Sequence, residues 1–506
     1  MSLAEPTETK APARLASSTP GVGRAKKFGT AATRAAIPAV SGSLYAARTK
    51  IHPQAVHGTF RRIKWALLAL TLGTYYLVPF LRWDRGPGEP SQAVLIDLDR
   101  GRFYAFSIEL WPQDVTYVMG LLILAALTLF LMNAVAGRVW CGYLCPQTVW
   151  TDLFLAVERL IEGDRRARLK LDAAPWSVEK VALRTMKHAI WLMIAWWTGG
   201  AWVLYFADAP TLVAQLATFQ APPVAYMAIL TLTATTYLLA GHMREQVCTY
   251  MCPWPRIQAA LTDEHALNIL YRGERGEPRV SAKKTAALRA AGQPAGDCVD
   301  CFACVTACPA GIDIRAGLQM DCIQCGLCVD ACDTVMGRLG RPGGLIGYDT
   351  EANCRSRAAG GPPVSRILRP RTVLYGLLVA GVGGGMLYGL ATRSFAGLSV
   401  LHDRNPLFVT LSDGATRNGY TVRLINKWHA ERRFALSVEG LAEARVEVVG
   451  GTPGALPVPP DATQEFRVLV FAPAGARPDP SVPLTFRIHD PATGETALAQ
   501  DTFKAP

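Results

Sequence analysis

A short segment near residue 300 contains a cysteine pattern that strongly limits what this chain can fold into. Within residues 298–332 the spacing C-x2-C-x2-C-x3-C occurs twice and uses eight of the chain's thirteen cysteines. Three thiolates spaced in this way can wrap one face of an iron–sulfur cube, and the fourth cysteine of each run then ligates the other cube. The spacing therefore predicts two [4Fe–4S] clusters. The predicted ligands are Cys298, Cys301, Cys304 and Cys332 for the first cluster, and Cys322, Cys325, Cys328 and Cys308 for the second.

Two other roles for these cysteines fit the pattern less well. Structural zinc sites usually group their ligands as two pairs with a longer spacer between them. Disulfides would require an oxidising compartment. A proline follows Cys308, as in bacterial ferredoxins, whereas Asp333 follows Cys332 where proline is usual. This difference changes the local backbone and leaves the ligand set intact.

Half of the 506 residues are hydrophobic, and the apolar residues gather in five long runs. A helix needs about 20 apolar residues to cross a bilayer. The runs lie at residues 63–81, 115–135, 188–206, 224–240 and 372–391. We therefore expect a membrane protein with about five transmembrane α-helices.

Lysine and arginine are distributed unevenly among the loops between these runs. Residues 1–64, 136–187 and 242–371 carry eleven, nine and sixteen of them, whereas residues 82–114 carry four and residues 207–223 carry none. Because basic loops remain on the cytoplasmic side, we expect a cytoplasmic N-terminus, cytoplasmic clusters and a C-terminus outside. The net charge of +12 has the same origin. It is dispersed and no nucleic-acid-binding motif accompanies it, so we expect no nucleic-acid partner.

A second cysteine motif, C-x3-C-P, follows the second and the fourth predicted spans. It occurs at Cys141 and Cys145 and again at Cys248 and Cys252. Both spans run towards the same side of the membrane in the predicted topology. Residues at i and i+4 share one face of a helix, so the two pairs can bring four thiols together.

Several kinds of chemistry suit four convergent thiols. Cu(I) is a soft ion that prefers sulfur ligands, and Met251 offers a thioether nearby. The thiols can also hold a further cluster or form redox-active disulfides. A purely structural alternative is that they are small buried side chains at helix ends. Because the motif is duplicated at matching positions, we take these cysteines as the second candidate site, for copper, a further cluster or redox-active disulfides.

Three other residues receive no chemical role. His188 and His242 lie at the inner ends of the third and fourth predicted spans, where an imidazole can simply face water. A second pair of histidines of the kind that binds haem is not evident. Cys354 fits neither cysteine pattern, and we predict a plain cytosolic thiol.

Composition divides the chain into five predicted segments. These are a disordered basic cytoplasmic tail at 1–60, a four-helix transmembrane region at 61–262, a dicluster ferredoxin module at 263–360, the fifth transmembrane helix at 370–393 and a C-terminal domain at 394–506. In the last segment, six short runs alternate apolar and polar residues between Gly/Pro turns, which predicts a β-sandwich of the immunoglobulin type. The runs are 407–411, 420–425, 433–438, 444–449, 465–471 and 484–488.

Nearly all of the chain after residue 50 resembles the CcoG/FixG/RdxA family, the membrane-bound cytochrome c oxidase accessory polyferredoxins of bacteria. The segments that carry the resemblance are FRRIKWALL, RFYAFSIELWPQD, GRVWCGYLCPQTVW, ERLIEGDR, KLDAAPWS, CTYMCPWPRIQ, GIDIRAGLQM and CVDACDTVM. The aspartate in place of proline after Cys332 also matches this family. Cys354 departs from it.

The resemblance implies an enzyme that reduces Cu(II) to Cu(I) for the maturation of cbb3-type cytochrome c oxidase. It also implies two [4Fe–4S] clusters, a homodimer, and a periplasmic immunoglobulin-like domain on a protein of the bacterial inner membrane. The expected partners are membrane lipid, copper-delivery and oxidase assembly proteins, and an electron donor that the sequence leaves open.

Our leading hypothesis is a cupric reductase in which electrons from a cytosolic donor reach Cu(II) held near Cys141, Cys145, Cys248 and Cys252. One alternative is an electron conduit to a partner oxidoreductase or to quinone. Another is a non-catalytic oxidase assembly factor in which the clusters are structural.

Overall fold

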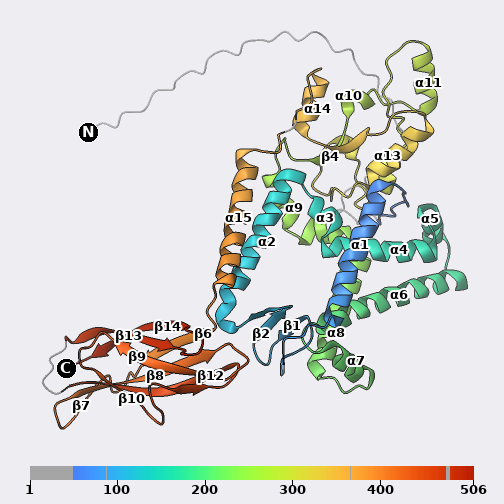
Figure 1. Ribbon diagram of the computed structural model, residues 1–506. Coiled ribbons are helices and arrows are strands. Elements are labelled where there is room, and N and C mark those ends of the chain that lie inside the picture. Colours follow the sequence, from blue (N-terminus) through green and yellow to red (C-terminus); the bar gives the residue numbers. More distant parts are fainter. Residues whose placement is uncertain (1–49, 87, 365, 474–478, 506) are drawn as a thin grey trace, which may run out of the picture. The chain divides into compact units, whose positions relative to one another are not determined.

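Figure 1 shows a computed structural model of the chain, which describes residues 50–86, 88–364, 366–473 and 479–505. The chain divides into two units, Met1–Lys50 and Ile51–Pro506. The predicted tail at residues 1–60 lies largely outside the described residues, and its disorder stays a prediction. The first described helix begins at Thr59.

Within the described residues, four helices are long and apolar enough to cross a membrane. Each has 21 to 25 residues, which suits a hydrocarbon core about 30 Å thick. They are α1 with η1 (Thr59–Leu77 and Val78–Phe80), η2 with α2 (Pro112–Asp114 and Val115–Ala136), α8 with the π-helical η3 (Pro223–Thr236 and Tyr237–Met243), and α15 (Pro370–Ala391). They coincide with four of the five predicted spans, and the chain is a multi-pass membrane protein.

The third predicted span, residues 188–206, falls within α6 (Val178–Val203). This helix has 26 residues, but its first turns carry Lys180, Arg184 and Lys187. It is not among the helices that qualify by length and composition. The expected five spans correspond to four such helices, with α6 as a further long helix packed against α8.

The two C-x3-C-P motifs occupy equivalent turns, as the predicted repeat requires. After α2 come α3 (Val139–Tyr143) and α4 (Pro146–Glu162), and after η3 come η4 (Val247–Met251) and α9 (Trp254–Leu261). The proline of each motif stands at the start of the next helix. Proline is favoured there because its missing N–H and fixed φ cost nothing in a first helical turn.

The doubled cysteine run lies between the two strands of a small sheet. Strand β4 (Asn268–Tyr271) pairs antiparallel with β5 (Ile346–Asp349), which brings the two ends of this segment together. The helices of the segment are α10 (Gly273–Gly276), α11 (Ala282–Ala290), α12 (Ala303–Ala307), η5 (Ile314–Ala316), α13 (Leu327–Arg338) and α14 (Glu351–Ala358). Buried Ile269, Met336 and Ile346 pack against the cysteines.

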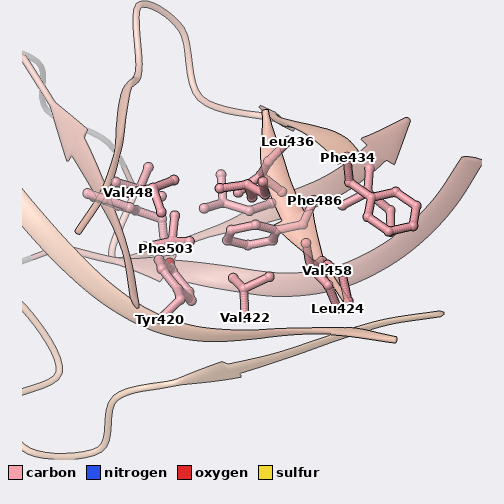
Figure 2. Packing of buried hydrophobic residues seen from close by; sticks show 14 of the residues in the cluster. Tyr420, Val422, Leu424, Phe434, Leu436, Val448, Val458, Phe486 and Phe503 are labelled. Carbon is pink, nitrogen blue, oxygen red and sulfur yellow. The ribbon is translucent and has the colours of Figure 1, made fainter. Parts of the chain in front are cut away.

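The C-terminal segment forms two antiparallel sheets, ordered β10-β12-β8-β6 and β11-β9-β13-β14, with β7 paired to β8. The strands are β6 (Ala396–His402), β7 (Val409–Thr410), β8 (Thr416–Asn426), β9 (Arg432–Glu439), β10 (Arg445–Val448), β11 (Leu456–Val458), β12 (Ala462–Ala472), β13 (Ser481–His489) and β14 (Thr496–Lys504). Tyr420, Phe434 and Phe486 are fully buried in the core that these strands enclose (Figure 2). The predicted β-sandwich is confirmed, with β6, β11 and β14 in addition to the six predicted runs.

Three short elements complete the chain. The loop between α1 and α2 forms a three-stranded sheet of β1 (Val94–Asp97), β2 (Arg102–Ala105) and β3 (Ile108–Leu110), which the sequence did not predict. Helices α5 (Arg165–Ala173) and α7 (Ala209–Ala217) flank α6 along the chain.

Candidate functional site

The two cysteine runs fold as loops with matching backbone conformations. The residues on either side of the second cysteine, Asp300 and Phe302 in one loop and Gln324 and Gly326 in the other, all have φ between 52° and 75°. These left-handed positions turn the chain sharply, so that successive cysteines face one point. The third cysteine of each run then enters a short helix, α12 or α13.

The fourth cysteine of each run lies beside the other three-cysteine loop. Cys308, Cys322, Cys325 and Cys328 line one cavity. Burial and the neighbouring thiols of Cys304, Cys298 and Cys301 together raise the pKa of Cys332 to about 12. The structure therefore brings together both predicted ligand sets, including the exchanged members.

These thiols have the chemistry that an iron–sulfur cluster requires. All thirteen cysteines are free of disulfides. Burial raises the pKa of Cys308 to about 12 and that of Cys304 to about 11, so without metal these thiols stay neutral. Iron displaces the protons when it binds. The residues fit two clusters, and the assignment of the individual ligands stays a prediction.

The four C-x3-C-P cysteines also come together. Burial raises the pKa of Cys141 to about 12, and Cys145, Cys248 and Cys252 all lie close enough to contribute to this value. The Cys141 thiol donates a hydrogen bond to Oε1 of Gln258 on α9, 3.3 Å away. The predicted convergence of two motifs that are more than 100 residues apart is therefore present.

The spacing between the thiols limits what they can hold. A single tetrahedral ion bound at about 2.3 Å needs sulfur atoms about 3.8 Å apart. Among the described residues, three potential ligand atoms lie within 4.8 Å of one another only at Glu89, Glu109 and His429. The cysteine groups therefore suit a cube with separate irons or, at the C-x3-C-P motifs, an ion that takes two of the thiols.

The first C-x3-C-P motif packs directly on the loop of the second cluster. A Cβ atom at Gly142 would lie 2.7 Å from the carbonyl oxygen of Ile323 and 3.1 Å from Cα of Cys325. The Tyr143 hydroxyl donates a hydrogen bond to the carbonyl oxygen of Cys325, 3.1 Å away. The glycine between the two cysteines of the motif is what allows the two backbones to approach so closely.

The second C-x3-C-P motif reaches the same loop from another side. The Thr249 hydroxyl donates a hydrogen bond to Asp321, the residue before Cys322, at 2.9 Å. A cavity of about 50 Å³ lies at this contact, and Cys248, Glu245 and Asp321 are among its lining residues. The Cys248 thiol and three carboxylates, those of Asp152, Glu245 and Asp321, thus line one small space beside the second cluster, together with Lys64 and Arg244.

Arg138 is a site residue that the sequence interpretation missed. It is buried, its backbone N–H donates to Oε1 of Gln324 at 2.8 Å, and its guanidinium donates to the carbonyl oxygens of Pro255 at 2.9 Å and Cys322 at 3.4 Å. It therefore joins both motifs to the second cluster loop. Its position three residues before Cys141 was the available signal.

The remaining candidates lie apart from these thiols. The rings of His188 and His242 stack with centroids 5.6 Å apart, and the Tyr237 hydroxyl lies 2.9 Å from Nδ1 of His188. The Cys354 thiol accepts a hydrogen bond from Arg357 at 3.3 Å. Neither observation assigns these residues a cofactor.

Three parts of the chain match known protein families. Residues 243–351 match a 4Fe-4S dicluster domain, and residues 118–162 match a 4Fe-4S binding domain. Residues 386–506 match the IG-like fold at the C-terminus of FixG, an oxidoreductase family. The second of these matches contains Cys141 and Cys145.

Whole-chain relatives show the same relationship. The nitrogen fixation protein FixG of Rhizobium meliloti is 50% identical over 498 residues, which cover 92% of this chain and 95% of that protein. Protein RdxA of Cereibacter sphaeroides is 52% identical over 442 residues, which cover 87% of this chain and 92% of that protein. Protein RdxB of the same organism is 50% identical over 438 residues, 86% of this chain and 91% of its own.

One solved structure, that of a FixG-related protein from Vibrio parahaemolyticus, matches 22% of this chain and 96% of its own at 23% identity. Its TM-score of 0.20 is too low to support a statement about the fold. The relatives and the family matches agree with the cysteine pattern, the apolar helices and the β-sandwich. The chain therefore belongs to the FixG/RdxA family of membrane polyferredoxins, iron–sulfur oxidoreductases with 4Fe-4S domains and a C-terminal immunoglobulin-like domain.

Proposed function

We propose that this protein is a cupric reductase, which takes one electron from a cytosolic donor and passes it to Cu(II) to form Cu(I). The Cu(I) then serves copper delivery and the maturation of cbb3-type cytochrome c oxidase, as the family resemblance implies. The observation that carries the proposal is the direct packing of both C-x3-C-P motifs on the second cluster loop, at Tyr143–Cys325 and Thr249–Asp321.

When bound, [4Fe–4S] clusters supply one-electron transfer. The exposure of the chain's own residues supports a direction for that transfer. Cys301 and Phe302, in the first cluster loop, are exposed, whereas Cys322 and Cys325 of the second are buried. A soluble donor can therefore dock at the first set, and the second set faces the C-x3-C-P thiols.

The cavity beside Cys248 suits both oxidation states of copper. Glu245 and Asp321 offer carboxylate oxygens, which attract Cu(II) ions. Thiol ligands prefer Cu(I), so a copper ion that takes two of these thiols is retained more strongly in its reduced form than in its oxidised form. Because the thiols bind Cu(I) more strongly than Cu(II), copper binding at this site favours the reduction of Cu(II). The homodimer, the cytoplasmic position of the clusters and the copper-delivery partners remain parts of this proposal.

The test is copper reduction by the anaerobically purified protein, reduced with dithionite and then freed of the excess reductant, followed by EPR before and after two equivalents of Cu(II), one for each reduced cluster. We expect the Cu(II) signal and the reduced-cluster signal to disappear together. Replacing Cys248 with serine should slow copper reduction at least tenfold while the reduced clusters remain visible. Cys354→Ser is the matched control, because that thiol lies outside all three cysteine groups, and it should react like the unchanged protein.

Reduced clusters that persist beside an unchanged Cu(II) signal would rule out the reductase. They would favour a second candidate, an electron conduit in which Cys141, Cys145, Cys248 and Cys252 hold a further [4Fe–4S] cluster. The match of residues 118–162 to a 4Fe-4S binding domain supports that candidate. Iron analysis separates the two, because the reductase with two clusters contains eight iron atoms per chain and the conduit contains twelve.

A further inference from the structure

Two glutamates and a histidine from distant parts of the chain meet far from any cysteine. Glu89 precedes β1, Glu109 lies in β3, and His429 lies in the turn between β8 and β9. One potential ligand atom from each lies within 4.8 Å of the other two, which holds for no other three such residues in the described part of the chain. The group therefore combines one imidazole and two carboxylates at a common point.

The distances are close to those around a bound ion. Nδ1 of His429 lies 3.4 Å from Oε1 of Glu89, and its Nε2 lies 3.9 Å from Oε2 of Glu109. Ligand atoms bound at about 2.1 Å lie about 3.0–3.5 Å apart around a tetrahedral or octahedral ion. Only one ring nitrogen can bind a given ion, so the imidazole of His429 must turn until a single nitrogen faces both carboxylates, which its exposed position allows.

The two carboxylates are buried and only partly satisfied. The side chains of Glu89 and Glu109 are 7% and 11% exposed. Tyr104 donates a hydrogen bond to Oε2 of Glu89 at 3.1 Å, and Oε1 of Glu109 pairs with the guanidinium of Arg102 at 3.1 Å. The other oxygen of each glutamate, Oε1 of Glu89 and Oε2 of Glu109, faces His429 and can bind a cation.

Charged side chains of both signs surround the three residues. Arg102 pairs with Glu109 at 3.1 Å and also with Asp461, and Arg85 interacts electrostatically with both glutamates. Oδ1 of Asp461 is buried and makes no hydrogen bond. A divalent ion would relieve the repulsion between the neighbouring carboxylates of Glu89 and Glu109.

We propose that Glu89, Glu109 and His429 form a binding site for a divalent first-row transition metal ion of the Zn(II) class. Such ions accept an imidazole nitrogen and carboxylate oxygens together, and three protein ligands leave a position for water. The site is chemically distinct from the thiol groups, which suit softer ions. It would join the sheet β1–β3 to the turn after β8, and it does not depend on the proposed copper reduction.

The test is calorimetric titration of Zn(II) into the full-length, cluster-loaded protein in detergent under anaerobic conditions. We expect His429→Asn and Glu109→Gln to weaken one Zn(II) site at least tenfold, as loss of a ligand does. The matched controls are the exposed residues His489 and Glu447 of the same domain, and His489→Asn and Glu447→Gln should leave affinity within twofold. His429 is 40% exposed in a turn, so its replacement tests binding without a large effect on folding.

X-ray absorption of the Zn(II)-loaded protein provides a second readout. We expect a shell of nitrogen and oxygen atoms at about 2.0–2.1 Å, with an imidazole contribution that His429→Asn removes. A sulfur shell at about 2.3 Å would place the zinc at the cysteines and overturn the proposal. Equal Zn(II) affinity in His429→Asn and the unchanged protein would overturn it as well, and would leave the three residues as an ion-paired contact.

Discussion

At the scale of single residues, the geometry of the candidate site depends on a glycine that has no side chain as well as on the cysteines that can bind metal. Gly142 stands between the two cysteines of the first C-x3-C-P motif, and its Cα faces the carbonyl oxygen of Ile323 and the backbone of Cys325. These neighbours are main-chain atoms of the second cluster loop, which cannot rotate away as a side chain can. The close approach of the first C-x3-C-P motif to the second cluster loop therefore depends on the absence of a Cβ atom at Gly142.

Replacing Gly142 with alanine tests this closeness. The added Cβ would lie 2.7 Å from a carbonyl oxygen, so one of the two loops must move. We expect copper reduction to fall at least tenfold and the EPR signal of the second cluster to change, while the signal of the first cluster is kept. Gly337→Ala in α13 is the control, since no atom lies within 4 Å of its added Cβ, and it should leave both signals and the rate unchanged.

At the scale of elements, buried ion pairs join helices α4, α5 and α6 to the segment just before the second C-x3-C-P motif. Glu158 of α4 is fully buried and pairs with Arg168 of α5 at 3.0 Å, with Lys187 of α6 at 3.6 Å and with Arg244 after η3 at 3.1 Å. One carboxylate thus contacts three cations from three elements. Arg244 lies four residues before Cys248, so this cluster also fixes where the second motif begins.

Replacing Glu158 with glutamine should destabilise this arrangement strongly. Removing one partner of a buried ion pair leaves uncompensated buried charge, which costs about 3–5 kcal/mol of unfolding free energy. We expect a lower midpoint of thermal unfolding, measured by circular dichroism in detergent. Glu431→Gln, which removes an exposed carboxylate, should change the free energy by less than about 0.5 kcal/mol. Equal midpoints for the two variants would contradict the role assigned to Glu158.

At the scale of the whole molecule, the meeting of the two C-x3-C-P motifs constrains the membrane topology. The motifs follow α2 and α8, so both helices must end on the same side, and the chain must cross once between them. The long helix between them is α6. At one end Lys187 pairs with Glu162 of α4 at 2.8 Å, and just beyond the other end the Leu204 carbonyl accepts a hydrogen bond from Gln92, in the loop after α1, at 2.8 Å. We therefore infer that α6 is the fifth crossing.

Reporter fusions test this inference. Alkaline phosphatase, which is active only outside the cytoplasm, should be active when fused after residue 208 and after residue 505. Green fluorescent protein should fluoresce when fused after residue 264. An inactive phosphatase at residue 208 would mean that α6 does not cross, and it would contradict the topology predicted from the lysine and arginine distribution.

Local patterns in the sequence were enough to predict the cluster loops, most spans and most strands. A ligand spacing, an apolar run and an alternation of apolar and polar residues each act over a few neighbouring residues, so each can be read without knowing the fold. The sheet β1–β3 and strands β6, β11 and β14 escaped because they are short or weakly alternating. The ion pairs of Arg184 and Lys187 with Glu162 of α4 also could not be predicted, because they join residues of separate helices.

The sequence by itself determined which residues can bind clusters and which segments are apolar, because ligand type and hydrophobicity belong to the residues themselves. Only the tertiary structure decided that Gly142 and Thr249 meet the second cluster loop, and that Arg138 links them. Only the tertiary structure brought Glu89 and Glu109 to His429. Contacts between residues hundreds of positions apart leave no periodic trace in a chain, since they depend on how whole elements pack.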